Sequence, residues 1–434
     1  MFDSMKIRTR RSHCLEIFEA AVSAVRPGRF LPPHLPAPPE TGRLFILAAG
    51  KAAGSMARAA EAHYLDDLGF PAERMTGLAV ARHGYGVPMR VVEMIEAGHP
   101  VPDEASLEGA RRMMALADLA GPDDLVVFLL SGGASANLIA PAGNITLAEK
   151  QAFTKILLRS GVPIDGMNAI RKHISRIKGG RLARHVAPAR LVTLALSDVP
   201  NDDFSTIGSG PTIPDVTTLQ NARAVIERYG ITAPPAIAAV LADPENESIK
   251  PGDPAFDKAT AIIAARPADA FAAAVAAAEK LGYQVVNLGS ELEGEARAIA
   301  AQHAVAALRA AEEGGKTALI SGGELTVTIR GEGVGGPNQE YALALAIGLG
   351  GASGVVACAA DTDGTDGGAG KPTDPAGAFV DPTTLKRAAE LGLDPAHFLE
   401  NNDSTRFFAA LDDLHQTGPT LTNANDLRVI LIGD

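Results

Sequence analysis

Several residue types are scarce in this chain of 434 residues, and each scarcity excludes a class of protein. Tryptophan is absent and aromatic residues make up only 4%, so the hydrophobic core must be built from Ala, Val, Leu and Ile. The two cysteines, Cys14 and Cys358, are too few and too far apart to suggest a disulfide framework or a thiolate metal site. No apolar run approaches the roughly 20 residues that a membrane helix needs.

Positive charge is also in deficit. The chain has 39 Lys and Arg against 51 Asp and Glu, a formal net charge of −12, which disfavours binding to nucleic acid or to anionic membranes. An anionic substrate would therefore need a local basic pocket. Residues 1–25 lack the long apolar region and cleavage site of a secretion signal, so we expect a cytoplasmic protein.

What the sequence does contain is a regular alternation of short apolar runs and amphipathic segments. The length predicts two α/β domains, and a segment rich in Pro, Asp and Glu at 243–254 suggests the division 1–240 and 241–434. Alternating strands and helices predict parallel sheets with helices on both faces. We expect strands at 44–49, 78–82, 91–97, 124–130, 190–196, 260–264, 284–288, 317–320, 326–329, 355–360 and 428–432, and helices at 13–25, 51–68, 103–119, 146–159, 167–184, 217–229, 268–280, 293–313, 339–347 and 382–391.

Glycines or aspartates follow five of the expected strands. In parallel sheets, ligands bind beyond the carboxyl ends of the strands, and backbone N–H groups of glycine-rich loops can turn toward an anion. The loop at 131–135, Ser-Gly-Gly-Ala-Ser, is therefore a candidate phosphate cradle. A tight turn explains any one such loop equally well, but less well as their number grows. The five loops are at 50–55, 131–135, 197–203, 321–324 and 359–370.

Two basic features could bind an anion. Lys51 directly follows the first expected strand, at the start of a helix, where its charge opposes the helix dipole unless an anion is bound. Arg171, Ser175 and Lys178 are spaced i, i+4, i+7 and would share one face of the expected helix at 167–184. That face could hold a carboxylate or phosphate. A surface lysine and a solvated helix face are the competing interpretations.

Three aspartates, Asp361, Asp363 and Asp366, lie among glycines after a buried strand. Mg²⁺ prefers one or two carboxylates together with waters and phosphate oxygens. The spacing is not that of an EF-hand, because position 372 is Pro where Glu is required. The loop therefore favours an Mg²⁺ that bridges to a substrate, with a solvated turn as the alternative.

A competing motif, G-x-G-x-x-G at 331–336, follows an expected strand and precedes a helix. This order is typical of dinucleotide binding and would predict an NAD(P)H-dependent oxidoreductase. Two features oppose that function. The Gly335-Gly336 pair and Pro337 indicate a loop rather than a tight turn, and the fingerprint leaves the other glycine loops and the aspartates unexplained.

Long motifs over nearly the whole chain together resemble the glycerate 2-kinases, the class II glycerate kinases with a C-terminal MOFRL domain. They are LLSGGASANLIAPA at 129–142, NAIRKHISRIKGGRLA at 168–183, LSDVPNDDFSTIGSGPTIPD at 196–215, SGGELTVTIRGEGVGGPNQEYALALA at 321–346, AADTDGTDG at 359–367 and GPTLTNANDLRVILI at 418–432. The resemblance implies ATP-dependent phosphorylation of D-glycerate at the C2 hydroxyl with Mg²⁺. It also implies a Rossmann-like first domain, an α/β MOFRL-type second domain, and an active site in the cleft between them. Relatives have often been labelled hydroxypyruvate reductase, which is the alternative function.

The resemblance and the motifs together give each candidate residue a role. Lys51 matches the position thought to be catalytic, and Asp198 is our candidate for accepting the C2 hydroxyl proton. Arg171, Ser175 and Lys178 are expected to bind the glycerate carboxylate. The residues expected to bind ATP phosphates are Gly50, Ser131, Gly132, Gly133, Ala134, Ser135, Gly322, Gly323 and Asn338, and the expected Mg²⁺ ligands are Asp198, Glu324, Asp361 and Asp363.

The chain departs from its resemblance at Pro337, where many relatives have Arg just before Asn-Gln-Glu. A phosphate-binding role of that Arg must be absent here or moved, with the basic segment 171–181 as the candidate replacement. A non-catalytic sensor of a sugar acid or nucleotide is the third class of function that remains open. We expect small-molecule substrates as partners, and either a monomer or a homodimer.

Overall fold

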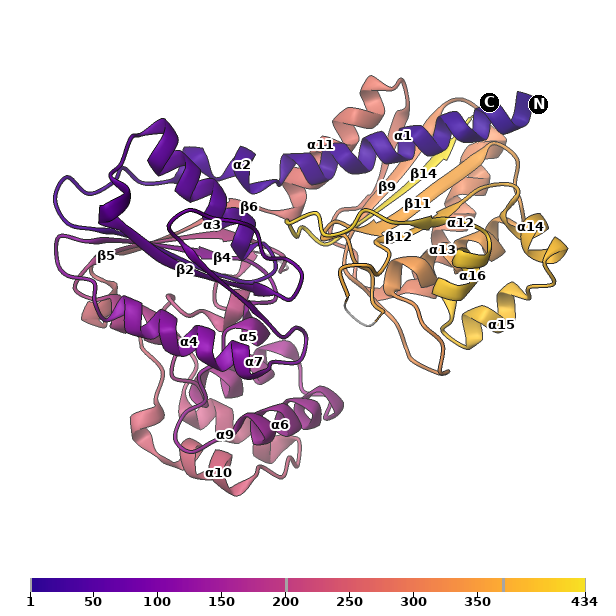
Figure 1. Ribbon diagram of the computed structural model, residues 1–434. Coiled ribbons are helices and arrows are strands. Elements are labelled where there is room, and N and C mark those ends of the chain that lie inside the picture. The colour runs from indigo at the N-terminus through magenta and orange to yellow at the C-terminus, as the bar shows by residue number, and fades with distance from the viewer. Residues whose placement is uncertain (1, 200–201, 369–370, 434) are drawn as a thin grey trace. The chain divides into compact units, whose positions relative to one another are not determined.

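The computed structural model describes residues 2–199, 202–368 and 371–433, and the chain divides into two compact units (Figure 1). The N-terminal unit is Phe30–Ala265, and the C-terminal unit joins Met1–Arg29 to Arg266–Asp434. The division thus comes at residue 265 rather than at the expected 240. The reason is that the strand Ala259–Ala265 completes the first sheet.

The N-terminal unit is built on a six-stranded sheet of order β3-β2-β1-β4-β5-β6, in which every pairing is parallel. This confirms the expected Rossmann-like arrangement. The central strands β1 and β4 are buried at every position, as strands covered on both faces must be. The strands are β1 (Leu44–Ala49), β2 (Met75–Arg82), β3 (Glu93–Ala97), β4 (Leu125–Leu130), β5 (Arg190–Leu196) and β6 (Ala259–Ala265).

Several helices of this unit begin at side-chain caps. Asp103 caps α4 as expected, and Thr146 and Thr218 cap α6 and α9, each within a reciprocal capping box. The helices are α2 (Pro27–Phe30, at the boundary), α3 (Ala53–Ala62), α4 (Glu104–Ala117), α5 (Ala134–Asn137), α6 (Leu147–Arg159), α7 (Ile164–His173), α8 (Arg181–Val186), α9 (Leu219–Arg228) and α10 (Pro235–Ala242). Shorter helical turns are Pro32–His34, His63–Asp67, Ala72–Arg74, Ile207–Ser209, Pro244–Asn246 and Pro254–Phe256.

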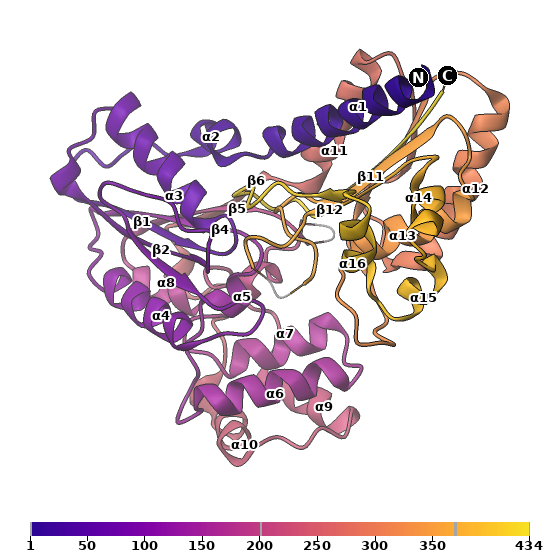
Figure 2. The same cartoon turned by 45° about the vertical axis from the view of Figure 1, so that its right-hand side comes forward.

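Four of these helices, α6, α7, α9 and α10, gather beside the sheet as a helical layer with its own core (Figure 2). Phe153 and Leu157 of α6 pack with Ile170 of α7 in that core. The polar residues that flank these apolar positions on α6 and α7 are therefore held close to one another.

The single helix expected at 167–184 is wrong. The chain leaves the helix at Ile174, and α8 starts only at Arg181. Gly179 and Gly180 have φ of 58° and 80°, which no right-handed helix accommodates. The intervening segment instead pairs with residues 140–142, since the N–H of Arg176 donates to the carbonyl of Ala140 at 2.7 Å. Arg171, Ser175 and Lys178 therefore do not share a helix face.

The C-terminal unit contains a six-stranded sheet of order β13-β12-β11-β14-β9-β7, in which only β7 and β9 pair in parallel. The expected all-parallel sheet is wrong here, because β12 and β14 run opposite to their neighbours. The completely buried β14 looks in sequence like a parallel strand, so composition does not reveal its direction. The strands are β7 (Gln284–Gly289), β8 (Gly294–Glu295), β9 (Thr317–Gly323), β10 (Leu325–Thr326), β11 (Val355–Asp361), β12 (Gly377–Val380), β13 (Leu414–His415) and β14 (Asp426–Ile432), with β8 and β10 forming a separate pair.

Helices cover both faces of this second sheet, with α1 and α11 on one face and α12 and α13 on the other (Figure 1). Small residues let α12 approach α13 closely, with Ala300 and Ala304 packing in one core with Leu343. The helices are α1 (Phe2–Ala24), α11 (Pro267–Lys280), α12 (Ala296–Glu313), α13 (Pro337–Leu349), α14 (Thr384–Glu390), α15 (Pro395–Glu400) and α16 (Ser404–Ala410).

Candidate active site

Two of the predicted loops meet at the carboxyl ends of the adjacent strands β1 and β4. The backbone N–H of Lys51 donates to the carbonyl of Gly132 at 2.8 Å, and the N–H of Ala52 donates to Oγ of Ser131 at 3.0 Å. Lys51 lies in the turn before α3 rather than within the helix. The turn that carries the expected catalytic lysine is therefore fixed to the expected phosphate loop by one backbone–backbone bond and one bond to the Ser131 hydroxyl.

Close packing explains two glycines of these loops. Gly50 has φ of 119°, and a Cβ there would lie 2.4 Å from the carbonyl oxygen of Ser131. Gly133 has φ of 83°, and a Cβ there would lie 3.1 Å from both Nε2 of His99 and Cγ of Lys51. His99 thus adjoins the candidate site, and the sequence reasoning did not single it out. Its position just beyond the carboxyl end of β3 is the signal that could have identified it.

A chain of polar contacts links the phosphate loop to α7. Oγ of Ser135 lies 3.0 Å from Oγ of Ser209, which donates to Oδ1 of Asn168 at 3.5 Å. Nζ of Lys178 donates to the neighbouring carbonyl of Gly208 at 3.2 Å. The helix that follows the phosphate loop, α5, has only four residues, so the helix dipole adds little to anion binding there.

Three cationic side chains lie close together beside these contacts, with Lys150 and Lys178 buried and Arg171 half-buried. The side chains of Lys150, Arg171 and Lys178 form no ion pair with a carboxylate in the described parts of the chain. Burial, reinforced by the charge of Arg171, lowers the pKa of Lys150 to about 7, and burial with repulsion from Lys150 and Arg171 lowers the pKa of Lys178 well below its usual value. Neighbouring Lys172, by contrast, pairs with buried Asp215 at 3.1 Å. Among the described residues, no carboxylate therefore balances these three side chains.

The other predicted residues of this unit have varied surroundings. Ser175 is buried, and its Oγ accepts the N–H groups of Ile177 and Lys178 at 3.3 Å, so it shapes the turn that holds Lys178. Asp198 follows the end of β5 and is half-buried. Arg181 donates to backbone carbonyls, including that of Asn246 at 2.6 Å, so its guanidinium is engaged within the unit.

The second Ser-Gly-Gly motif is not a loop. Gly322 and Gly323 belong to β9 and pair with Leu427 and Asp426 of β14. The carbonyls of both glycines accept hydrogen bonds from buried Arg428, at 2.6 and 3.0 Å. A Cβ on Gly323 would lie 2.2 Å from the backbone nitrogen of Leu292. These glycines therefore serve close packing.

The aspartate loop contributes to the folding of α13. Oδ1 and Oδ2 of Asp366 accept the backbone N–H groups of Asn338 and Gln339, at 3.0 and 2.8 Å, and so cap the start of that helix. Nδ2 of Asn338 also donates to Oδ1 of Asp426 at 2.7 Å. Burial, together with the charge of Asp426, raises the pKa of Asp366 to about 7, and burial raises the pKa of Asp426 as well. Asp366 thus has a structural role.

The remaining acidic residues of this unit do not form a closed metal cage. Oδ1 of buried Asp363 accepts the N–H and the hydroxyl of Thr365 at 2.8 and 3.0 Å, and Oδ1 of Asp361 accepts the N–H of Asp363 at 2.8 Å. Glu324 is exposed. Within the residues that the structure describes, no group of three or more His, Cys, Asp or Glu is suited to a metal ion. One or two carboxylates suit an Mg²⁺ that arrives on phosphate oxygens rather than a resident ion.

The glycines of the G-x-G-x-x-G motif are explained by packing. A Cβ on Gly331 or Gly333 would lie 2.5 Å from the carbonyl oxygen of Asn401, and a Cβ on Gly336 would lie 2.3 Å from that of Asp366. The preceding strand β10 ends at Thr326, far from the start of α13, so the tight strand-to-helix turn of a dinucleotide site is absent from this described segment.

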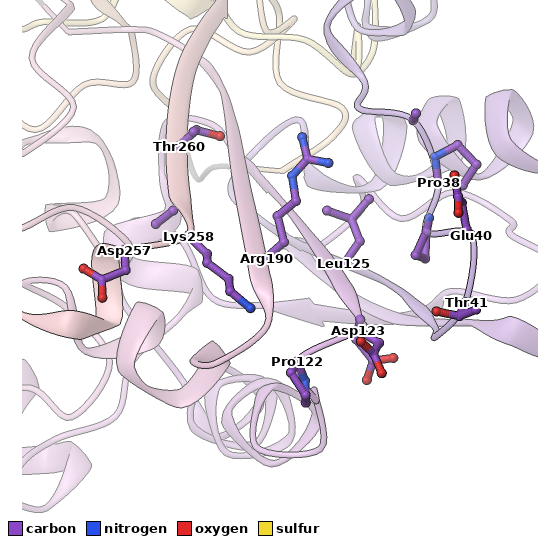
Figure 3. Close-up of a pocket in the computed structure, with 14 residues that line it drawn as sticks. Pro38, Glu40, Thr41, Pro122, Asp123, Leu125, Arg190, Asp257, Lys258 and Thr260 are labelled. Atoms are coloured by element: carbon purple, nitrogen blue, oxygen red, sulfur yellow. The ribbon is translucent and has the colours of Figure 1, made fainter.

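A cavity of about 650 Å³ lies at the opposite edge of the first sheet, where Leu125, Arg190 and Thr260 line it near the amino ends of β4, β5 and β6 (Figure 3). In a parallel sheet the amino and carboxyl ends of the strands lie at opposite edges. This cavity is therefore separate from the loops around Lys51 and Ser135.

Comparisons with known proteins find relatives that match nearly the whole chain. The model described as a domain of unknown function (DUF4147) matches residues 13–242, and the MOFRL family model matches residues 317–426. A putative hydroxypyruvate reductase of Agrobacterium vitis is 46% identical over 96% of this chain and 93% of its own. The D-glycerate 2-kinase of Thermotoga maritima is 37% identical over 100% of both chains.

Solved structures agree with the sequence relatives. The crystal structure of glycerate kinase from Thermotoga maritima matches 98% of this chain and 100% of that chain, with a TM-score of 0.83 and 36% sequence identity. The helices of the described residues include none long and apolar enough to cross a membrane. By sequence over its full length and by fold, this chain is a member of the glycerate kinase family with a MOFRL domain.

Proposed function

We propose that the protein is an ATP-dependent kinase that phosphorylates D-glycerate at the C2 hydroxyl to give 2-phosphoglycerate. The observation that carries this proposal is the cluster of buried Lys150, buried Lys178 and half-buried Arg171. The cluster lacks carboxylate partners in the described chain and lies beside the candidate phosphate loop. In a protein of net charge −12, this cluster is a site for an anionic substrate. The names of the relatives supply the identity of that substrate.

Phosphoryl transfer mainly requires that the reacting groups be positioned and that the phosphate charge be cancelled. The backbone N–H groups of residues 131–135 would hold ATP phosphates, and Lys51 would stabilise the transferring γ-phosphoryl group. The hydrogen bond from Lys51 to Gly132 supports this assignment, because it fixes the base of the lysine to the loop. Gly322 and Gly323 are omitted from the proposed site, since their carbonyls accept hydrogen bonds from Arg428. Asn338 is omitted because its Nδ2 donates to Asp366 and Asp426 within the C-terminal unit.

The hydroxy acid would be held by its carboxylate. Arg171 can bind a carboxylate with two parallel hydrogen bonds, and Lys178 adds a second positive charge. Asp198, at the end of β5, remains our candidate for accepting the C2 hydroxyl proton. Mg²⁺ would enter with ATP, and Asp361 and Asp363 are the proposed carboxylate ligands. Since ATP is the phosphoryl donor, the proposal includes a cytoplasmic location.

The test is product formation from D-glycerate, ATP and Mg²⁺, coupled through enolase, pyruvate kinase and lactate dehydrogenase, without phosphoglycerate mutase. NADH loss that requires both ATP and enolase would identify 2-phosphoglycerate as the product. A signal restored only by added mutase would show 3-phosphoglycerate and contradict the proposed hydroxyl.

Hydroxypyruvate reduction is the second candidate, since it is the name of two relatives at 46% and 45% identity. It predicts NADH or NADPH oxidation with hydroxypyruvate in the absence of ATP. The packing roles of Gly331, Gly333 and Gly336 remove the sequence motif that favoured it.

A further inference from the structure

Lys150 occupies an unusual position on α6. The helix is capped by Thr146 and Glu149, and the face formed by Lys150, Phe153 and Leu157 is buried. Phe153 and Leu157 enter the core shared with Ile170 of α7, so Lys150 faces toward the helix that carries Arg171. Only 7% of Lys150 is exposed.

A buried ammonium group without a partner is costly, and proteins rarely keep one unless something binds there. The described chain around Lys150 offers only positive neighbours, Arg171 and Lys178, and no carboxylate. Lys172 of the same unit provides the comparison. It is also buried, but its ammonium group is paired with the carboxylate of Asp215. The difference indicates that Lys150 is retained for a ligand.

We propose that Lys150 is a specificity-determining residue that, with Arg171 and Lys178, forms a pocket for the carboxylate of the hydroxy-acid substrate. This inference rests on the proposed function for the identity of the acid. The carboxylate is the better occupant than an ATP phosphate, because Lys51 and the loop at 131–135 already supply a separate phosphate site. Lys178 connects the proposed carboxylate pocket with the proposed phosphate site. Its Nζ donates to the carbonyl of Gly208, and the next residue, Ser209, contacts Ser135 of the phosphate loop.

The number of cations also predicts the class of acid. A bound carboxylate favours the protonated forms of Lys150 and Lys178. A single carboxylate does not balance the three positive side chains that result, so hydroxy acids with a second carboxylate, such as tartronate, should also bind. Neutral analogues such as glycerol should not compete, since they leave the buried cations without a counter-charge.

The experiment compares Lys150→Met with Lys155→Met, an exposed lysine of the same helix. We expect Lys150→Met to raise KM for D-glycerate about tenfold or more, while KM for ATP changes less than about twofold. Lys155→Met should match the wild type. A rise in KM for ATP with KM for D-glycerate unchanged, or equal effects of the two variants, would overturn the proposal.

A second measurement does not depend on turnover. D-glycerate and tartronate, each without ATP, should raise the thermal midpoint of the wild type and of Lys155→Met, and neither should protect Lys150→Met. Protection that is lost in Lys150→Met would support the pocket even if the kinase assay failed. Equal protection of all three proteins would refute the pocket even if the kinase assay succeeded.

Discussion

Each unit contains a cluster of buried ionisable groups, and the two clusters differ in whether the described chain supplies their partners. In the C-terminal unit, the buried carboxylates of Asp366 and Asp426 are bonded to Asn338, Gln339 and Arg428, so the charges are held by a polar network. In the N-terminal unit, buried Lys150 and half-buried Arg171 have no acidic partner among the described residues. A satisfied buried network supports a fold, while an unbalanced one leaves room for a ligand.

The glycine-rich segments at 331–336 and 131–135 also differ in what their glycines contact. Residues 331–336 use glycine so that their backbone can pack against 401–404, which satisfies their polar groups within the unit. Gly133 instead lies close to the side chains of Lys51 and His99 in the candidate site. Glycine-rich sequence alone therefore does not distinguish a structural loop from a binding loop.

The largest expected effect is that of Lys51→Ala, which removes the charge proposed to stabilise the transferring phosphoryl group. We expect kcat to fall by two or more decades, a loss of roughly 3 kcal/mol. Steady-state kinetics would measure this, with Arg58→Ala, an exposed cation of α3, as the control. Turnover near the wild-type value in a folded Lys51→Ala protein would exclude Lys51 from the mechanism.

Asp366→Asn tests whether the buried carboxylate of Asp366 stabilises the C-terminal unit. An amide cannot accept the N–H groups of both Asn338 and Gln339 through two oxygens, so the start of α13 loses part of its cap. We expect the free energy of unfolding to fall by about 2 kcal/mol. Chemical denaturation would measure it, with exposed Asp412→Asn as the control. A neutral result would show that the aspartate is not retained for the helix.

Lys150→Met should have the opposite effect on stability, although it weakens substrate binding. Replacing a buried ammonium that lacks a carboxylate partner with an apolar side chain of similar length should raise the free energy of unfolding by about 1–2 kcal/mol. Denaturation of the ligand-free protein would show this, and Lys155→Met should leave stability unchanged. A destabilised Lys150→Met protein would mean that the amine has a structural partner.

Gly133→Ala separates backbone strain from crowding of the site. Gly133 and Gly161 both have positive φ, but a Cβ on Gly161 meets no atom within 4 Å. Both alanine variants should lose about 1 kcal/mol of stability, and only Gly133→Ala should lower kcat, by about tenfold. Equal kcat values for the two variants would remove the Gly133 loop from the reacting centre.

A further expected effect is on the pH dependence of stability. The pKa of Asp366 rises from 3.8 in the unfolded chain to about 7 in the folded protein, so between these values the folded state binds more protons. The contribution of Asp366 is present below the lower value and is lost as pH rises through about 7. Asp366→Asn should flatten the decline in unfolding free energy across this window, as measured by denaturation at several pH values.

Sequence reasoning succeeded where local pattern determines structure. Apolar runs predicted the range of β1 and the parallel first sheet. A capping residue, Asp103, predicted the start of α4. It failed where tertiary pairing decides. The helix expected through Ser175 is broken by pairing with residues 140–142, and the direction of β14 depends on strands distant in sequence.

The candidate site shows the same limit. Lys51 and Ser135 were predictable because they follow strands of the sheet. Lys150 was not, because an isolated lysine on an amphipathic helix looks like a surface residue until the packing of α6 on α7 buries it. The position of His99 was not predictable either, since only the folding of the chain brings its side chain next to Gly133.

The measurement that tests the central claim most directly is calorimetric titration of D-glycerate into the wild-type protein at about pH 8, in buffers of different ionisation enthalpy. With its pKa near 7, Lys150 is mostly neutral in the free protein, and a bound carboxylate raises that pKa. The account predicts that glycerate binding takes up protons, and that Lys150→Met reduces the uptake. Glycerate binding with no proton uptake in any buffer would contradict it.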